Sequence, residues 1–257
     1  MKLRILGCGT STGVPRIGGD WGLCDPSNPR NRRSRASILV EADGYVILVD
    51  TGPDMREQLL AAECGKVDAV IYTHDHADHC HGIDDLRQLF HVSGRPVDIY
   101  ARQDTLDTLH ARFTYAFTGK NGYPPTVSGH LLPDDFRLGP MRVRVTDLPH
   151  GNITSAALRF DWQGRSMAYS TDFHAMTNEA MALFEGLDLW VVDALRRRPH
   201  ATHPYLMQAL EWIEQLSPGQ AVLTHMDQSM DYATLAAELP PGVEPGYDGL
   251  TVTLKRR

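Results

Sequence analysis

Short apolar runs alternate with amphipathic stretches along the whole chain. Five segments have the length and the β-branched content of buried strands: "LRILG" (3–7), "ASILVEA" (36–42), "YVILVD" (45–50), "DAVIYT" (68–73) and "DLWVVDA" (188–194). An Asp-Gly pair separates the second from the third, which predicts a hairpin. Further strands are expected at 96–101, 141–147, 155–161, 166–170, 220–225 and 249–255.

Helical patterns lie between these runs. They cover residues 53–62, 82–90, 104–117, 204–216 and 232–239, and the first opens with Pro-Asp, as helices commonly do. Interleaved strands and helices predict a layered α/β architecture. The chain of 257 residues has no internal repeat, and its 42% hydrophobic content is enough for a substantial core.

Composition narrows the classes of partner. The net charge of −7 argues against a broad nucleic-acid-binding face, so no stable nucleic-acid partner is expected, but a small anionic substrate remains compatible. No apolar run approaches the length of a membrane span, and the N-terminus has no apolar signal segment. The four cysteines form no C-x-x-C pair and suit free thiols in a reducing compartment. We therefore expect a cytoplasmic protein without a membrane partner.

One ten-residue stretch concentrates metal-ligand chemistry. "THDHADHCHG" (73–82) holds four of the chain's 12 histidines and two aspartates, directly after a predicted buried strand. Imidazole and carboxylate are ligands of borderline divalent metals. His74 and His76 are two apart, so an extended backbone puts both rings on one side, whereas Asp78 and His79 point elsewhere. The loop can thus offer two pairs of ligands, and neither pair completes a site alone.

The missing ligands are expected at the ends of other strands, because loops at strand ends are where sites are usually built. His150 in "LPHGN", Asp172 in "YSTDFH" and His225 in "LTHMD" are the candidates, and Asp50 closes an early strand. Two neighbouring metal ions would lower the pKa of a water and clamp the attacking and leaving oxygens, which is hydrolytic chemistry.

The loop reproduces the H-x-H-x-D-H signature of the metallo-β-lactamase superfamily, which the chain resembles over essentially its whole length. The resemblance implies a single domain (1–257) with a four-layer αββα sandwich and two divalent ions, Zn²⁺ or Mn²⁺. It implies one ion on His74, His76 and His150, the other on Asp78, His79 and His225, and Asp172 between them. Asp50 would orient a histidine or the loop from behind the ligands.

Other stretches resemble the phosphoribosyl cyclic phosphate phosphodiesterase subfamily, which is often dimeric, so a homodimer would fit. These stretches are "GTSTGVPRIGGDWG", "THDHADHCHGIDDLR", "HATHPYLMQALEWI" and "GYDGL". The resemblance implies that His203 is a catalytic histidine, and Arg87 is the arginine best placed to bind phosphate. The expected reaction is cleavage of a small cyclic or nucleotide-like phosphodiester by metal-activated hydroxide, with His203 as general acid. The arginines of residues 30–35 are expected to be solvated or to pin their loop through salt bridges.

Three alternatives stay open. A tRNA 3′-processing endonuclease shares the signature, but the acidic balance and the lack of a recognisable long tRNA-gripping arm weigh against it. A thioester or lactone hydrolase would not need His203 or the arginines. A non-catalytic metal-binding scaffold would typically have lost ligands, and none is lost here. The N-terminal cysteines that hold a structural zinc in the subfamily are reduced here to Cys24, with Cys8 well before it, so that zinc is expected to be absent.

Overall fold

Two seven-stranded mixed sheets form the centre of the computed structural model, which describes all residues 1–257. The first sheet has the order β14-β1-β2-β3-β4-β5-β6 and the second β13-β12-β11-β10-β9-β8-β7. The first contains β1 (Lys2–Gly7), β2 (Ser37–Ala42), β3 (Tyr45–Val49), β4 (Ala69–Ile71), β5 (Val97–Ala101), β6 (Val127–Leu131) and β14 (Thr251–Thr253). The second contains β7 (Asp135–Leu138), β8 (Met141–His150), β9 (Ile153–Trp162), β10 (Arg165–Ser170), β11 (Leu189–Asp193), β12 (Ala221–Thr224) and β13 (Val243–Pro245).

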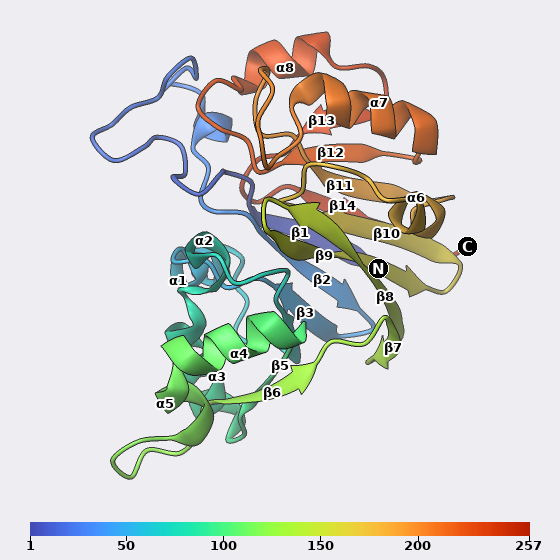
Figure 1. Cartoon of the computed structure of the whole chain (residues 1–257). Helices are drawn as coiled ribbons and strands as arrows, with labels where there is room; N and C mark the ends of the chain where they lie inside the picture. The colour runs from blue at the N-terminus through green and yellow to red at the C-terminus, as the bar shows by residue number, and fades with distance from the viewer.

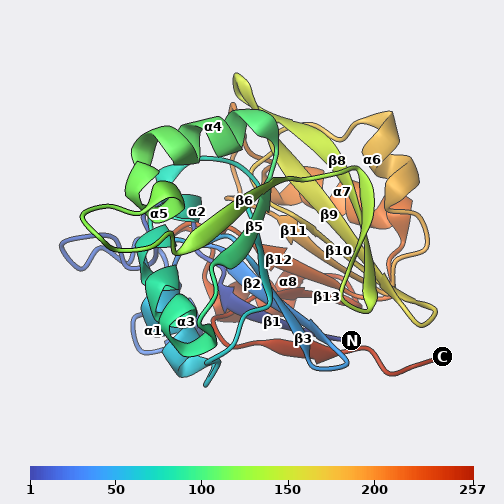
Figure 2. The same cartoon turned by 90° about the horizontal axis from the view of Figure 1, so that it is seen from below.

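Helices cover the outer face of each sheet (Figures 1 and 2). The first sheet carries α1 (Met55–Ala61), α2 (Ala77–Cys80), α3 (Leu86–Ser93), α4 (Gln103–Arg112) and α5 (Thr114–Thr118). The second carries α6 (Asn178–Leu183), α7 (Leu206–Leu216) and α8 (Tyr232–Glu238), and two 3-10 turns, η1 (Pro29–Asn31) and η2 (Ile83–Asp85), complete the chain. The layers are therefore helix, sheet, sheet and helix, which confirms the predicted αββα sandwich.

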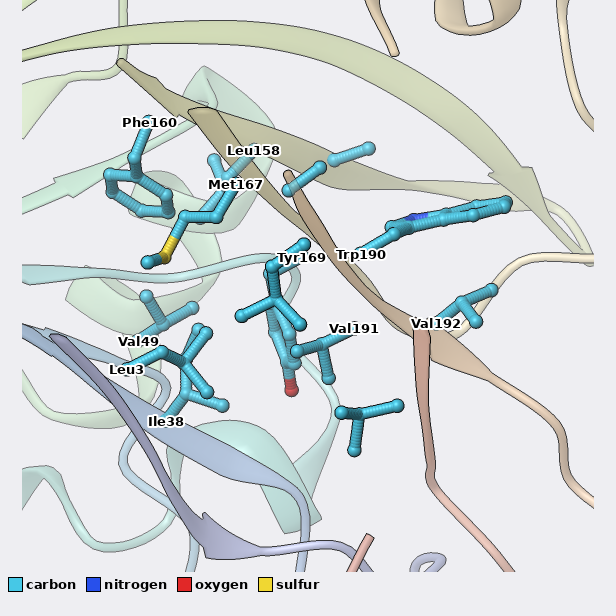
Figure 3. Close-up of a cluster of buried hydrophobic side chains, with 14 of the residues drawn as sticks. Leu3, Ile38, Val49, Leu158, Phe160, Met167, Tyr169, Trp190, Val191 and Val192 are labelled. Atoms are coloured by element: carbon cyan, nitrogen blue, oxygen red, sulfur yellow. The ribbon is translucent and has the colours of Figure 1, made fainter. Parts of the chain in front are cut away.

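The strands are apolar on both faces because each face meets a different core. In β3, Ile47 and Val49 point into the large core between the sheets, whereas Leu48 points into the smaller core under α1, α3 and α4. Figure 3 shows the large core, where Leu3 and Ile38 of the first sheet lie opposite residues of the second. Burial on both faces explains why these strands read as continuous apolar runs.

Most predicted elements agree with the structure. One predicted helix is divided, and several short or polar elements were not predicted. The helix expected at 104–117 is divided, because Phe113 leaves the helical region with φ −125° and ψ 37°. The strands β6, β7 and β13 and helix α6 were not expected from the sequence, nor was the short helix α2, which lies within the stretch predicted as the ligand loop. No helix combines the length and the hydropathy needed to cross a membrane.

Candidate metal centre

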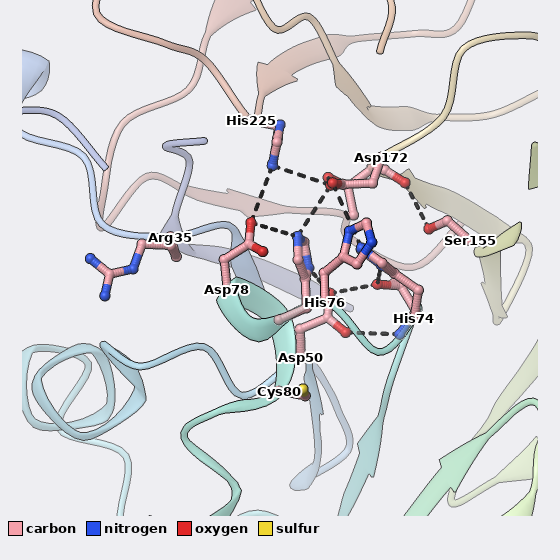
Figure 4. A network of polar contacts seen from close by, with 12 residues as sticks. Arg35, Asp50, His74, His76, Asp78, Cys80, Ser155, Asp172 and His225 are labelled. Carbon is pink, nitrogen blue, oxygen red and sulfur yellow. Dashed lines mark hydrogen bonds and ion pairs between the residues drawn. The ribbon is translucent and has the colours of Figure 1, made fainter. Parts of the chain in front are cut away.

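The predicted ligands converge at one end of the sandwich, where loops follow β4, β8, β10 and β12. Candidate donor atoms lie within 4.8 Å of one another in each of three overlapping groups, and two of these consist only of predicted ligands. One group is His74, His76, His150 and Asp172, and the other is Asp78, His79, Asp172 and His225. In Figure 4, the labelled side chains of His74, Asp78, Asp172 and His225 converge from the two sheets. All seven residues predicted as ligands are therefore brought together.

Asp172 stands between the two groups. Its Oδ2 lies 3.7 Å from Nε2 of His74 and 3.6 Å from Nε2 of His150. Its Oδ1 lies 3.2 Å from Nε2 of His79 and 3.3 Å from Nε2 of His225. One carboxylate oxygen thus faces each group, which is the arrangement that a bridging ligand needs.

The carboxylate of Asp50 fixes the orientation of the two histidines on the β4 loop. It accepts hydrogen bonds from the Thr73 amide (2.8 Å), from the Thr73 hydroxyl (2.8 Å) and from Nδ1 of His79 (2.7 Å). Because the Thr73 hydroxyl donates to Asp50, it accepts from Nδ1 of His74 at 3.0 Å. Both rings therefore turn Nε2 toward Asp172, which is the orientation that metal-ligating histidines adopt.

A backbone carbonyl orients His150 in the same way. Nδ1 of His150 donates to the carbonyl of Thr202 at 2.9 Å, which leaves Nε2 free to face the centre. The more exposed His76 approaches from the opposite side, with its Nδ1 3.3 Å from Nε2 of His150. The first group thus has one member at the protein surface, and a substrate could approach from that side.

Three residues of the centre have left-handed backbone. Asp50 (φ 64°), Asp172 (φ 55°) and His225 (φ 57°) each follow the last residues of a buried strand. Non-glycine residues adopt this conformation at a cost of roughly 1–3 kcal/mol, and such strain clusters at functional sites. At each position it turns a side chain out of the strand direction and into the centre.

The backbone of the ligand loop packs closely on the loop after β3. A Cβ on Gly52 would stand 2.4 Å from the Asp78 carbonyl, and a Cβ on Gly82 would stand 2.2 Å from the Gly52 carbonyl. The Thr51 amide donates to the His79 carbonyl at 2.8 Å. Only glycine allows this approach, which holds α2 and its ligands against the sheet.

Burial and charge act in opposite directions on the ligands. Burial lowers the pKa of His74 well below its usual value. Burial would also lower the pKa of His79, but the carboxylates of Asp172, Asp78 and Asp50 outweigh it and raise that pKa well above the usual value. Likewise, burial alone would raise the pKa of Asp172, and the neighbouring histidines hold it well below. The centre is therefore built to hold positive charge.

Unpaired buried atoms show that the residues present fit a metal. The Nε2 atoms of His74, His79 and His225 are buried and have no hydrogen-bond partner. Such orphans are costly and rare in native proteins. All three lie near the carboxylates of Asp172 or Asp78, so the donor set and its geometry suit divalent ions of the zinc or manganese type.

A histidine and a carboxylate sit beside the two groups. Nδ1 of His203 donates to Oδ2 of Asp193 at 2.8 Å, and Nε2 of His203 lies 3.8 Å from Oδ2 of Asp172. The carboxylate of Asp193 is fully buried at the end of β11 and also accepts from the Asp172 amide at 3.0 Å. His203 thus lies at the edge of the cluster, held in one orientation.

Arg87 is not brought to the centre. Its side chain is 57% exposed on α3 and pairs with Asp84 at 3.6 Å. The cavities that it lines contain none of the seven ligands. The turn η2 carries the chain from the ligand loop onto the outer face of the first sheet, so the predicted contact of Arg87 with substrate has no support in this geometry.

Apart from Asp50, sequence reasoning did not assign a role to the residues that orient the histidines of the site. Asp193, Thr73 and Thr202 act through hydrogen bonds to His203, His74 and His150. Only Asp193 left a signal, because it is a charged residue at the end of the apolar run "DLWVVDA". The partner of a backbone carbonyl such as that of Thr202 leaves no trace in sequence.

Comparisons with known proteins agree with this geometry. A solved diphosphatase of the PhnP family superposes with a TM-score of 0.90 at 35% identity, covering 99% of this chain and 98% of that one. The short form of human tRNase Z superposes with a TM-score of 0.73 at 18% identity, covering 99% and 100%, and thus shares the fold.

Curated relatives are matched over about half of their length. An octanoyltransferase of Porphyromonas gingivalis is 34% identical over 268 residues, which is 100% of this chain and 52% of the relative. Ribonuclease Z of Azobacteroides pseudotrichonymphae is 26% identical over 58% of this chain and 48% of its own length. Residues 45–226 match the model of the β-lactamase superfamily domain. The chain therefore belongs to this superfamily, with the metallo-β-lactamase fold and a close structural likeness to a diphosphatase of the PhnP family.

Proposed function

We propose that the protein is a dinuclear metal-dependent phosphodiesterase that cleaves a small anionic phosphodiester of cyclic or nucleotide-like type. One observation carries the proposal: a buried His203–Asp193 pair, joined at 2.8 Å, stands at the edge of two overlapping ligand groups. A thioester hydrolase needs no such proton donor, because a thiolate leaves readily without one, whereas an alkoxide leaving from phosphorus does.

The two groups would hold one ion each, on the residues already described, with Asp172 shared. Divalent ions bound there would lower the pKa of a water and withdraw charge from the phosphoryl oxygens. Asp50 keeps His79 and, through Thr73, His74 in the orientation that presents Nε2. The identity of the metal, zinc or manganese, belongs to this proposal.

His203 handles the proton of the leaving group. Asp193 accepts from Nδ1, so a protonated ring directs its Nε2–H toward the cluster. When a hydroxide, formed from water by loss of a proton to the solvent, makes its bond to phosphorus, the ester P–O bond breaks and Nε2 of His203 gives its proton to the departing oxygen; the ring then takes up a proton from the solvent. The negative carboxylate of Asp193 stabilises the imidazolium before that transfer.

The comparisons support a phosphate substrate. The solved relative at 35% identity is a diphosphatase, and the likeness spans nearly the whole of both chains. The ribonuclease Z relatives suggest a second candidate function, that of a nuclease acting on pre-tRNA. The match to one of them covers 58% of this chain. Cleavage of pre-tRNA would distinguish the two, since only a nuclease would cut it.

The reaction class can be tested with protein loaded with Zn²⁺ or Mn²⁺. We expect hydrolysis of bis(p-nitrophenyl) phosphate and of a 2′,3′-cyclic nucleotide, and no comparable turnover of a thioester, a lactone or pre-tRNA. Turnover of the thioester or lactone alone would contradict the proposal, and specific cleavage of pre-tRNA would assign the nuclease function instead.

The role of His203 predicts a dependence on the leaving group. His203→Ala should slow cleavage of the cyclic nucleotide, whose leaving oxygen is an alkoxide, by about 10²–10⁴-fold. It should slow release of p-nitrophenolate much less, because that anion leaves without protonation. The metal content of His203→Ala should match that of the wild type. His91 is an exposed histidine on α3, and the control variant His91→Ala should match the wild type in activity on both substrates. Equal loss on both substrates would refute the acid role.

A further inference from the structure

A second cavity lies at the end of the sandwich away from the metal centre. It encloses about 400 Å³, and five arginines line it: Arg137, Arg142, Arg159, Arg165 and Arg257. Arg142 lies near the start of β8, and His150 is the last residue of that strand. At about 3.3 Å per residue, the strand alone separates the cavity from the ligand by roughly 25 Å. Arg165 likewise begins β10, whose far end leads to Asp172.

The cavity has more guanidinium groups than carboxylates. Asp161 and Asp188 are the only acidic residues in its lining, so positive charges exceed negative ones by three. Each of these carboxylates is already shared: Asp188 accepts from Arg165 at 2.6 Å and from Arg257 at 3.1 Å. This local excess stands out in a chain whose net charge is −7.

Several N–H groups in the cavity have no protein acceptor. Arg142 gives its Nε and Nη2 to Asp135, and no acceptor is found for its Nη1. Arg165 gives its Nε to the Lys255 carbonyl and its Nη1 to Asp188, and its Nη2 is likewise without an acceptor. Arg137 lies directly opposite Arg142 in the β7–β8 ladder and makes no side-chain hydrogen bond or ion pair. Adjacent guanidinium groups on this sheet therefore carry N–H groups that donate to no protein acceptor.

We propose that this cavity binds a multivalent phosphate anion, such as pyrophosphate or the polyphosphate group of a nucleotide. Guanidinium groups meet phosphate oxygens bidentately, and an excess of three charges favours a polyphosphate over a single phosphate. The one aromatic ring in the lining, Trp162, is covered by Arg256 at 5.4 Å and bonded to Asp43, so it offers no free face for a base. The site recognises the phosphates themselves and does not depend on the function proposed for the metal centre.

Calorimetric titration of the full chain with inorganic pyrophosphate tests the proposal. We expect a site that binds equally well in metal-loaded protein and in protein treated with a chelator, and that binds pyrophosphate more tightly than sulfate at equal ionic strength. In R137Q/R142Q the affinity should fall about tenfold or more. R137K/R142K should retain part of it, because the charge stays and the planar fork is lost.

A double variant with the same loss of charge serves as control. R56Q/R197Q removes two exposed arginines that pair with Glu57 and Glu238 far from the cavity, and it should bind pyrophosphate like the wild type. If both double variants bound pyrophosphate equally weakly, the effect would be a general electrostatic attraction to the whole protein, and the proposal would be overturned. Loss of binding on metal removal would assign the anion to the metal centre. Binding of a nucleic acid without binding of pyrophosphate would also overturn it. Unchanged thermal unfolding of each variant establishes that it is folded.

Discussion

Individual side chains in the metal centre are oriented by partners that come from other strands. His79 is held by Asp50, His150 by the Thr202 carbonyl, and His203 by Asp193. Each bond occupies Nδ1 and leaves Nε2 to face the cluster. The chemistry of the site therefore depends on residues that touch neither metal nor substrate, and Asp193 is the one that can be altered most cleanly.

Asp193→Asn keeps an acceptor for Nδ1 of His203 and removes the negative charge. We expect kcat on the cyclic nucleotide to fall by about 10–100-fold with KM little changed. Adding Asp193→Asn to His203→Ala should cost little more than His203→Ala alone, since Asp193 acts through the ring of His203. A parallel drop in metal content would instead show that Asp193 supports the ligands.

The sequence revealed which residues meet, but not how they are turned. The spacing of His74, His76, Asp78 and His79 on one loop is a local pattern, and it predicted the cluster. The left-handed backbone at Asp50, Asp172 and His225 depends on packing around each strand end, which no short pattern records. Arg87 shows the same limit, because the direction of α3 after η2 decided its place.

At the scale of elements, the arginine-rich loop is tied to the C-terminal part of the chain. Arg33 is buried and donates to the carbonyls of Met230 (2.6 Å) and Asp227 (3.3 Å), just after His225. Arg30 stacks on Tyr232. The run was expected to be solvated or to form salt bridges; it does pin its loop, but mainly through carbonyls and aromatic rings, with one salt bridge, from Arg35 to Asp54 at 3.1 Å. It supports the segment that carries His225.

Asp248 also connects distant segments through hydrogen bonds, and its burial predicts that the stability of the fold depends on pH. Its carboxylate accepts from the Ser34 amide (2.7 Å) and hydroxyl (2.7 Å) and from the Cys8 amide (3.1 Å). Burial raises its pKa from 3.8 to about 6, and these bonds only partly oppose the rise. Because the folded state holds the proton more tightly, this group stabilises the fold below about pH 4 and loses that contribution as the pH rises through about 6.

Asp248→Asn removes the titration. Across the interval from about pH 4 to about pH 6 the wild type should lose about 1–2 kcal/mol of unfolding free energy relative to the variant. Urea unfolding of both proteins at several pH values measures the difference. Asp104→Asn, an exposed change on α4, should show no such trend. A difference that grows in the opposite direction would contradict the assignment.

Elements that sequence analysis missed lie mostly at the borders of the sheets. β6 and β13 end their sheets, as does β7, and their sequences "VSGHL", "VEP" and "DFRL" are polar or broken by Gly or Pro. Edge strands need bury only part of their surface, so no apolar run marks them. The central strands β3, β4 and β11 are buried on both faces, and these were recognised.

For the whole molecule, the metal centre joins the two sheets. His74, His76, Asp78 and His79 follow strand β4 of the first sheet, whereas His150, Asp172 and His225 follow strands of the second. The large core between the sheets holds 44 buried residues, yet at this end the sheets meet through charged side chains. Without metal, buried Nε2 atoms that have no hydrogen-bond partner face each other there, so ion binding should stabilise the entire fold.

Metal binding should therefore raise the thermal unfolding midpoint. An ion present at 100 times its dissociation constant adds about 2.7 kcal/mol to the unfolding free energy, provided that the unfolded chain does not bind it. Zn²⁺ or Mn²⁺ should raise the midpoint, and a chelator should reverse the change. Asp172→Asn should lose most of the gain, because its two oxygens face both ligand groups. His91→Ala, outside the centre, should keep the full gain. If Asp172→Asn gained as much as the wild type, the ions would be bound elsewhere, and Asp172 would not join the two halves of the site.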